Sequence, residues 1–335
     1  MNEQPTDVKL LSPLEYLARA VELIDQATSR IYLIGMTIFR DDTTRELIDA
    51  ISRAARRGVN VHVAADFMTF TYAISGLKTF PLTYRSRSIR EMANLKKQFS
   101  HDGVKFRWLG QHSGPMFTGR THSKWLVVDD VAFSFGGINT EKEAFVDHID
   151  YMLEFRDAHL ANLLAAEHEK IEAADRARTS SRNHRARIRD GLVLFDGGKA
   201  GRSIIYNAAV KLANEASEIL LVSQYCPTGK LAKILATKPS RIYFNQLENV
   251  DKLLNRMMIR LGKSAIREHN LYHHETYLHA KFAIFTMPDG TKTAITGSYN
   301  FVALSGRLGQ REVALATSNP QIISLLEKFW RENVK

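Results

Sequence analysis

Two segments of the chain carry the same reactive side chains at the same spacing. His122 and Lys124 precede one apolar run, and His279 and Lys281 precede another. Residues i and i+2 of a β-strand point to the same face, so each His–Lys pair is expected to project together from a buried strand. An imidazole can act as a nucleophile or a proton donor, and an ammonium group can stabilise developing negative charge.

Each His-x-Lys segment is followed by a glycine-containing turn that ends in asparagine. The two turns are Gly136-Gly137-Ile138-Asn139 and Gly297-Ser298-Tyr299-Asn300. A single His-x-Lys is common on protein surfaces and carries little information. Repetition of the apolar strand together with the turn is improbable by chance. The repeat therefore predicts two similar halves, each of which supplies one histidine to a single site.

The whole pattern resembles the signature of the phospholipase D superfamily, His-x-Lys-x4-Asp-x6-Gly-[Gly/Ser]-x-Asn. The first copy matches it from His122 through Asp129 to Asn139. Within the superfamily, the first half looks most like bacterial cardiolipin synthases and related phosphatidyltransferases. The residues that carry this likeness are Thr121–Asp129, Phe135–Asn139 and Asp150-Tyr151.

The second copy departs from the signature at two places. Thr286 stands where the family has aspartate, and the turn 287–290 lengthens the segment before Gly297. Asp289 lies within this turn and is not expected to replace the missing carboxylate. The histidine, the lysine and the asparagine of this copy are all present.

The resemblance implies an α/β fold with two similar α-β-α halves, in which mixed sheets flanked by helices pack about a pseudo-twofold axis. We expect an N-terminal half at residues 1–160, a helical and basic linker at 161–195, and a C-terminal half at 196–335. The order strand, helix, strand near the start of each half predicts parallel pairing with a right-handed crossover.

The two histidine sets suit phosphodiester chemistry that needs neither a metal nor a cofactor. One imidazole attacks phosphorus to form a phosphohistidine, and the other protonates the leaving alkoxide. Either histidine can be the nucleophile, and the complete motif favours His122. The expected catalytic residues are His122, Lys124, Asn139, His279, Lys281 and Asn300. The expected supporting residues are Asp129, Asp150, Glu312, Gly137 and Ser298.

Two of these supporting residues are carboxylates that occupy equivalent positions. Asp150 follows the first glycine turn, and Glu312 follows the second. In the family an acid near this point orients the catalytic histidine. An imidazole in catalysis needs such an acceptor to fix its tautomer.

Composition limits the partners and the location of the protein. The chain has 335 residues, of which 44% are hydrophobic and 24% charged, and its net charge is +10. Such a positive charge indicates a polyanionic partner, either an anionic phospholipid surface or nucleic acid. The polar N-terminus lacks the apolar core of a signal peptide, and no run is long enough to span a membrane. A single cysteine, Cys226, excludes an internal disulfide, so we expect a cytoplasmic protein, at most peripheral to a membrane. One active site needs no more than a monomer.

The resemblance implies transfer of a phosphatidyl group between alcohols, or hydrolysis of a phospholipid. A nuclease with the same histidines and a non-catalytic phosphate-binding module are the alternatives. The aromatic and basic segment 67–86 is expected to be a long loop, either at the mouth of the site or packed on itself. His273 and His274 are a weak indication of metal binding, because no further ligand pattern accompanies them.

The remaining pattern predicts the main helices and strands. Helices are expected at 14–29, 45–57, 88–99, 203–216, 228–237, 249–265 and 321–333. Strands are expected at 31–39, 59–66, 104–108, 147–155, 217–225, 241–245 and 311–315. Residues 156–190 are expected to form a helix that runs into an arginine-rich linker.

Overall fold

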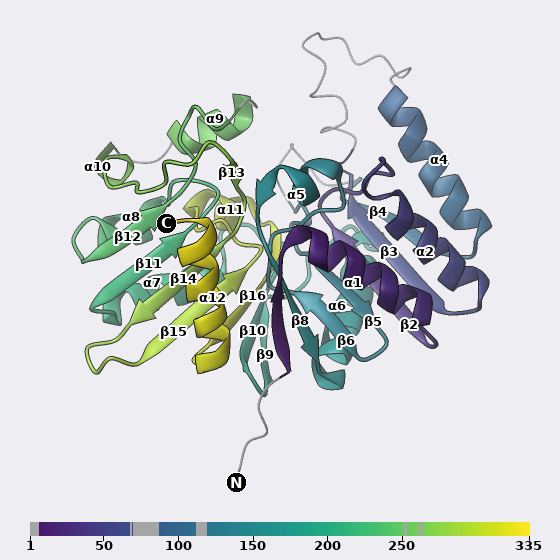
Figure 1. Ribbon diagram of the computed structural model, residues 1–335, viewed down its shortest axis with the longest axis horizontal. Coiled ribbons are helices and arrows are strands. Elements are labelled where there is room, and N and C mark those ends of the chain that lie inside the picture. The colour runs from purple at the N-terminus through teal and green to yellow at the C-terminus, as the bar shows by residue number, and fades with distance from the viewer. Residues whose placement is uncertain (1–6, 68, 70–86, 112–118, 251–252, 261–263) are drawn as a thin grey trace.

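The computed structural model describes residues 7–67, 69, 87–111, 119–250, 253–260 and 264–335. Within them the chain forms two seven-stranded sheets, one from each half of the sequence, which stand side by side in Figure 1. Both sheets contain parallel and antiparallel pairs. The predicted α/β fold with two mixed sheets flanked by helices is confirmed.

The first sheet has the strand order β1-β8-β6-β5-β2-β3-β4. Its strands are β1 (Val8–Leu11), β2 (Arg30–Gly35), β3 (Asn60–Asp66), β4 (Lys105–Leu109), β5 (Trp125–Val128), β6 (Val131–Ser134) and β8 (Met152–Arg156). The predicted parallel pairing of β2 with β3 is confirmed, and β4 continues it.

The second sheet has the strand order β12-β11-β14-β15-β16-β10-β9. Its strands are β9 (His184–Ile188), β10 (Gly191–Gly197), β11 (Glu218–Val222), β12 (Ser240–Tyr243), β14 (Phe282–Thr286), β15 (Lys292–Gly297) and β16 (Arg311–Thr317). Six neighbouring strands of this sheet, taken in the order β10-β16-β15-β14-β11-β12, correspond to β1-β8-β6-β5-β2-β3 of the first sheet. Their order and their parallel or antiparallel pairing are the same. The two halves are therefore internal repeats, with β4 and β9 as additions at opposite ends.

Helices cover the outer faces of the sheets and fill the space between them. The helices are α1 (Pro13–Gln26), α2 (Arg45–Arg56), α4 (Arg87–His101), α5 (Lys142–Val146), α6 (Ala158–Arg176), α7 (Ile204–Glu215), α8 (Gly229–Leu235), α9 (Leu253–Arg260), α10 (Ser264–Arg267), α11 (Ala303–Leu308) and α12 (Pro320–Asn333). One apolar core joins α1, α2 and α4 to the first sheet, and another joins α7 and α8 to the second. The largest core lies between the sheets and includes side chains of α6 and α12.

Alternate residues of one strand show how the sheets are sandwiched. Ile31 and Leu33 of β2 pack into the outer core, whereas Tyr32 and Ile34 pack into the central one. A strand covered on both faces is uniformly apolar, which is why β2 was recognisable in the sequence. The helix expected at 14–29 is α1, and the Ser12 N–H donates to the Glu15 carboxylate at its first turn at 2.8 Å.

Two short connections tie the halves together where the sheets meet. The strand β7 (His148–Ile149) pairs in parallel with β13 (Tyr277–Leu278) from the other half. On the equivalent side, Thr121 and Arg311 form an isolated parallel bridge. Each connection joins the residues just before one His-x-Lys to the strand region that carries the acid of the opposite half.

Three expectations about secondary structure were wrong. The His-x-Lys residues do not lie within strands, because their backbone bonds to the other half and β5 and β14 begin only after the lysines. The single strand expected at 147–155 is two strands, β7 and β8, interrupted at Asp150-Tyr151. The arginine-rich segment is no simple linker, since residues 184–188 form the edge strand β9.

Further differences concern strands and boundaries. The strands β1, β6, β10 and β15 were not foreseen, because each is short or flanked by turns. The helix expected at 249–265 is seen as α9 and α10. The domain limits at 160 and 195 stay a prediction. All of the segment 67–86 except residues 67 and 69 lies outside the described residues. Among those described, no helix has the length and apolarity that a membrane span requires.

Candidate active site

The two His-x-Lys segments occupy equivalent places where the sheets meet. The backbone N–H of His122 donates to the carbonyl oxygen of Arg311 at 2.8 Å, and that of His279 donates to Ile149 at 2.9 Å. Each histidine is thus fixed by the half that does not contain it. Both side chains are buried, with relative exposures of 7% for His122 and 5% for His279.

Each imidazole contacts the carboxylate of the opposite half. The Nδ1 atom of His122 lies 2.9 Å from Glu312 Oε2, and Nδ1 of His279 lies 2.6 Å from Asp150 Oδ2. A carboxylate can only accept, so Nδ1 carries the proton and Nε2 keeps its lone pair. Asp150 and Glu312, predicted from their place after the glycine turns, are therefore both at the site, and their partners cross between the halves.

The glycine turns position these two carboxylates. Asp150 Oδ1 accepts from the N–H of Gly137 at 3.2 Å and from the N–H of Tyr151 at 2.8 Å. On the other side, the Ser298 hydroxyl donates to Glu312. A Cβ on Gly137 would lie 2.5 Å from the Asp150 carboxylate and 3.0 Å from His279 Nδ1, so any side chain here would displace this pair.

Two buried lysines lie beside the histidines. Lys124 Nζ donates to the carbonyl oxygen of His122 at 2.9 Å, and Lys281 Nζ donates in the same way to that of His279. Burial lowers the pKa of Lys124 to about 8, although the charge of Glu312 acts in the opposite direction. Burial also lowers the pKa of Lys281 against the attraction of Asp150. Both ammonium groups gain from a further negative charge in the site.

The histidines are electrostatically linked to the same lysines. Burial is the main cause that lowers the pKa of His122, and the charge of Lys281 adds to it. The pKa of His279 lies well below 6.5, again chiefly through burial, with contributions from Lys281, His148, Lys124 and His122. These cross-influences indicate that both His–Lys pairs share one site. Without substrate, both imidazoles are neutral at pH 7.

The pKa values of the two carboxylates, Asp150 and Glu312, are shifted in opposite directions. Burial raises the pKa of Asp150, and the nearby Lys281 only partly offsets this. Burial also acts to raise the pKa of Glu312, but the charge and hydrogen bond of His122 outweigh it, and the net shift is downward. Glu312 consequently loses its proton at a lower pH than Asp150 does.

The two asparagines at the ends of the turns are buried and retain free acceptor atoms. Asn139 and Asn300 have relative exposures of 7% and 6%. Neither Oδ1 atom has a hydrogen-bond partner within the described part of the chain. Buried polar atoms without partners are rare in folded proteins. These amides are therefore available to a bound molecule.

The match to known families falls on the half with the complete motif. Residues 20–171 match the model of the "Cardiolipin synthase, PLD-like domain" family. These residues, just under half of the chain, form a phospholipase D-like domain. This likeness supports phosphodiester chemistry by an enzyme. A search among curated proteins found no significant match.

Two solved structures share the fold of this chain. Phosphatidylserine synthase from Haemophilus influenzae has a TM-score of 0.72 at 15% identity, covering 98% of this chain and 86% of that chain. Polyphosphate kinase from Porphyromonas gingivalis has a TM-score of 0.62 at 13% identity, covering 98% of this chain and 51% of that chain. At these identities the comparisons show the fold alone.

Asp129, the acid of the superfamily signature, is not near the histidines. It follows β5 with a φ of 50°, and its carboxylate accepts from the N–H groups of Thr28, Ser29 and Arg30 at 2.9–3.0 Å. At the equivalent place Thr286 ends β14, where its carbonyl oxygen accepts from the Ser217 N–H at 2.8 Å. In both halves this position joins two strands.

Sequence reasoning missed several residues next to the site. The His148 ring stacks on that of His279, with centroids 5.2 Å apart, and Tyr277 packs against both. Arg311 is buried and donates to the carbonyl oxygens of Gly119 and Thr179 at 2.9 and 3.2 Å. The one available signal was their position beside the acids: His148 is two residues before Asp150 and Arg311 is one residue before Glu312.

Proposed function

We propose that this protein is a phosphatidyltransferase or phospholipase that cleaves phospholipid phosphodiesters through a phosphohistidine intermediate. The observation that carries the proposal is the pair of imidazoles, each held by a carboxylate of the opposite half and flanked by a buried lysine. This arrangement supplies one nucleophile, one proton donor and positive charge for the phosphoryl oxygens. The residues themselves are sufficient for the steps that follow.

In the first step, His122 Nε2 attacks phosphorus while the bond to the leaving oxygen breaks. Glu312 accepts the Nδ1 proton in a hydrogen bond and stabilises the positive ring that forms. We assign this role to His122 because its motif is complete. His279 provides the proton for the leaving alkoxide. Its pKa is low in the free protein, and the negative charge of a bound phosphodiester raises it.

In the second step, an alcohol or water attacks the phosphohistidine. Its proton passes to His279, the bond between phosphorus and His122 breaks, and the starting state returns. Lys124 and Lys281 offset the charge on the phosphoryl oxygens throughout. Asn139 and Asn300 hold the reacting groups. Their Nδ2–H groups donate to phosphoryl oxygens, and their free Oδ1 atoms accept hydrogen bonds from hydroxyl groups. An alcohol acceptor gives transfer, and water gives hydrolysis.

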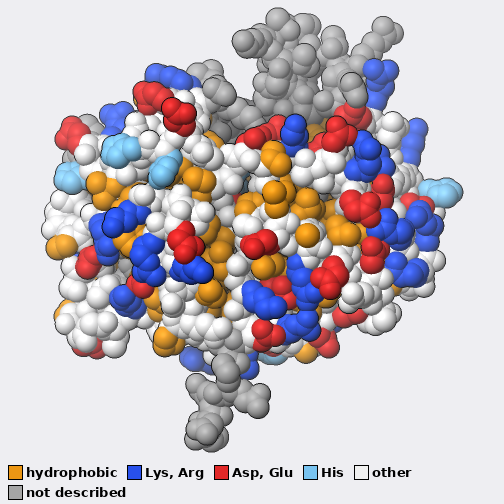
Figure 2. Space-filling view, viewed as in Figure 1, with side chains coloured by type: hydrophobic (Ala, Val, Ile, Leu, Met, Phe, Trp, Pro, Cys, Tyr) orange, Lys and Arg blue, Asp and Glu red, His pale blue; other side chains and the backbone are white. Residues whose placement is uncertain are grey.

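Several observations favour a lipid as substrate. The matching family is described as cardiolipin synthase, and the chain shares its fold with a phosphatidylserine synthase. Apolar side chains gather over α1 and α5 on the face seen in Figure 2. Leu14 of α1 and Val146 of α5 are 56% and 48% exposed. A pocket beside them reaches His148 and Asp150. An apolar surface near the site, together with a net charge of +10, suits an anionic membrane surface.

Product analysis tests the proposal. The purified protein is incubated with phosphatidylglycerol vesicles and, separately, with single-stranded and double-stranded DNA, each with and without a chelator. His122→Ala and His279→Ala are measured in parallel, and His101→Ala, on the exposed side of α4, serves as the matched control. We expect lipid turnover that is lost in both site variants and kept in the control.

The other outcomes identify the alternatives. DNA cleavage without lipid turnover would replace the proposal by a nuclease. Lipid turnover that survives both substitutions would contradict the assigned site. Binding of phosphodiesters without any turnover would make the protein a phosphate-binding module. Intact-mass analysis after rapid acid-free quenching distinguishes the nucleophile, because only the variant that keeps His122 can carry the phosphatidyl adduct.

A further inference from the structure

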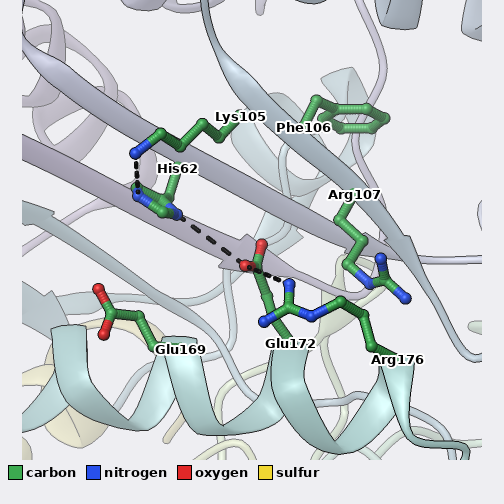
Figure 3. Close-up of a pocket in the computed structure, with 7 residues that line it drawn as sticks. All are labelled: His62, Lys105, Phe106, Arg107, Glu169, Glu172 and Arg176. Carbon is green, nitrogen blue, oxygen red and sulfur yellow. Dashed lines mark hydrogen bonds and ion pairs between the residues drawn. The ribbon is translucent and has the colours of Figure 1, made fainter.

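A second cluster of ligand-type side chains lies between β3 and α6, in the first half. It consists of His62 from β3 and of His168 and Glu172 from α6. One ligand atom from each lies within 4.8 Å of the other two. Figure 3 shows His62 and Glu172 pointing toward each other in a pocket that these elements line. None of the proposed catalytic residues lines this pocket.

The histidines of this cluster have ring nitrogens without a close hydrogen bond. His168 is fully buried, and neither of its ring nitrogens has a hydrogen-bond partner among the described residues. The same holds for Nδ1 of His62. Of these atoms, His168 Nε2 and His62 Nδ1 have only the longer contacts to Glu172, at 3.6 and 4.0 Å. A buried polar atom without a hydrogen-bond partner destabilises the fold, so each such atom calls for an explanation, such as an ion.

The spacing of the donor atoms fits a metal ion. Glu172 Oε2 lies 4.0 Å from His62 Nδ1, and Oε1 lies 3.6 Å from His168 Nε2. Four ligands at roughly 2.0–2.1 Å from zinc lie about 3.4 Å from one another. The three side chains therefore need to close by only about 1 Å. His168 and Glu172 are one helical turn apart and share one face of α6.

We propose that His62 Nδ1, His168 Nε2 and the Glu172 carboxylate bind a zinc-class divalent cation. Two imidazoles and one carboxylate are a ligand set that zinc uses, with water in the fourth position. The pocket lets solvent reach that fourth position, because the side chains of His62 and Glu172 are 12% and 9% exposed. The ion would join the sheet to α6, the helix that leads into the second half, and so stabilise the fold.

The surroundings hold the rings in place. The ring of Tyr32 stacks on His62, with centroids 4.7 Å apart, and meets His168 edge-on at 5.4 Å. The Tyr32 hydroxyl donates to Glu169 at 2.8 Å, which fixes the tyrosine. Rings fixed on both sides lose little freedom when they bind an ion.

Two cations compete with the proposed ion. Lys105 Nζ lies 3.4 Å from His62 Nε2 and is also bonded to Asn60 at 2.8 Å. An Arg176 nitrogen lies 3.5 Å from Glu172. With the metal on Nδ1, Nε2 carries a proton, so the exposed Lys105 must turn away. Removing this lysine should therefore strengthen metal binding. A cluster that serves only to pack the sheet against α6 would give no such result.

Metal titration of the full chain tests the site. Chelator-treated protein is titrated with Zn²⁺ by calorimetry and with Co²⁺, whose visible absorption distinguishes tetrahedral nitrogen and oxygen ligation. We expect one equivalent to bind, and the melting temperature to rise with Zn²⁺. His62→Gln and Glu172→Gln should each weaken binding at least tenfold, the loss typical of a ligand or its closest partner. Lys105→Met should tighten it several-fold.

The control is the double variant His273→Ala/His274→Ala, which removes another histidine pair and leaves the cluster intact. It should bind the metal like the unaltered protein. The proposal is overturned if no equivalent binds, if the Co²⁺ spectrum is octahedral and unchanged in Glu172→Gln, or if binding disappears in the double variant alone. His62 lies at the solvent side of the cluster. The circular dichroism spectrum of His62→Gln shows whether a loss of metal binding comes from the missing ligand or from unfolding.

Discussion

Glu312 lies 2.9 Å from the Nδ1 atom of His122, although 190 positions separate the two residues in the chain. The equivalent pair, Asp150 and His279, is 2.6 Å apart and crosses the same boundary in the opposite direction. Neither half of the chain therefore contains a complete histidine–carboxylate pair. The candidate site exists only when the two repeats are packed against each other.

The crossed carboxylate leads to the first prediction. In Glu312→Gln, the amide can donate to Nδ1 and select the wrong tautomer of His122, so kcat should fall by about 10²–10⁴. The KM should change little, since Glu312 does not face the substrate. Steady-state kinetics on the substrate identified by product analysis measure both. Glu143→Gln, on an exposed position of α5, should behave like the unaltered protein. If kcat fell equally in Glu143→Gln, the role of Glu312 in orienting His122 would be refuted.

The pH dependence of the reaction follows from the lysine and histidine pKa values. His122 must be neutral to attack, and its pKa is below 6.5, so kcat/KM should fall only as the pH drops below that value. Lys124 and Lys281 must be charged, and burial lowers their pKa values to about 8 and about 7. Activity should therefore fall again as the pH rises above about 7, by roughly tenfold per pH unit for each lysine that loses its proton. A rate that stays flat up to about pH 10 would show that these charges are not needed.

Gly137 should be intolerant of any side chain. The Cβ of Gly137→Ala would meet Asp150 at 2.5 Å and the Lys281 nitrogen at 2.9 Å. These groups are buried and cannot move far, so we expect activity to fall at least tenfold, while the protein remains folded. Ser298→Ala at the equivalent place of the other half adds no atoms and only removes the hydroxyl bonded to Glu312. It should retain more activity than Gly137→Ala, and the reverse order would contradict the argument from space.

The sequence was informative where local chemistry repeats and less so where distant segments meet. The two histidines, the lysines and the acids were recognisable because each motif occurs twice. The crossing of Asp150 to His279 was not, because no short-range pattern reports which repeat an acid faces. For the same reason His122 was expected inside a strand, whereas its N–H pairs with Arg311 of the other half. Tertiary pairing decided these points over local periodicity.

The strand β9 illustrates a different limit. Its residues 184–188 contain exposed arginines and pair along one edge with β10. Edge strands carry charges that prevent further pairing, so their composition resembles that of a solvated linker. The pattern from which a linker was expected is thus also the pattern of a protected sheet edge.

Asp129 provides the last prediction, because the superfamily signature contains it although it lies away from the histidines. Its carboxylate accepts from three backbone N–H groups at the start of β2. Asp129→Ala should lower the free energy of unfolding by about 1–3 kcal/mol, the cost of donors left without partners. Asp129→Asn should lose less, because one oxygen remains and asparagine tolerates the left-handed φ of 50°. Urea unfolding measures both values.

The kinetics of these variants complete the test. We expect kcat to be unchanged in Asp129→Ala at temperatures well below its melting point, since the hydrogen-bond partners of the carboxylate in the described part of the chain are Thr28, Ser29 and Arg30. Asp130→Ala, an exposed neighbour that pairs with Arg30 at 3.4 Å, is the matched control and should change stability by less than about 1 kcal/mol. A fall in kcat without a loss of stability in Asp129→Ala would instead give the signature aspartate a role in the reaction. The same result would make the threonine at position 286 a functional difference between the halves, rather than a second way to join two strands.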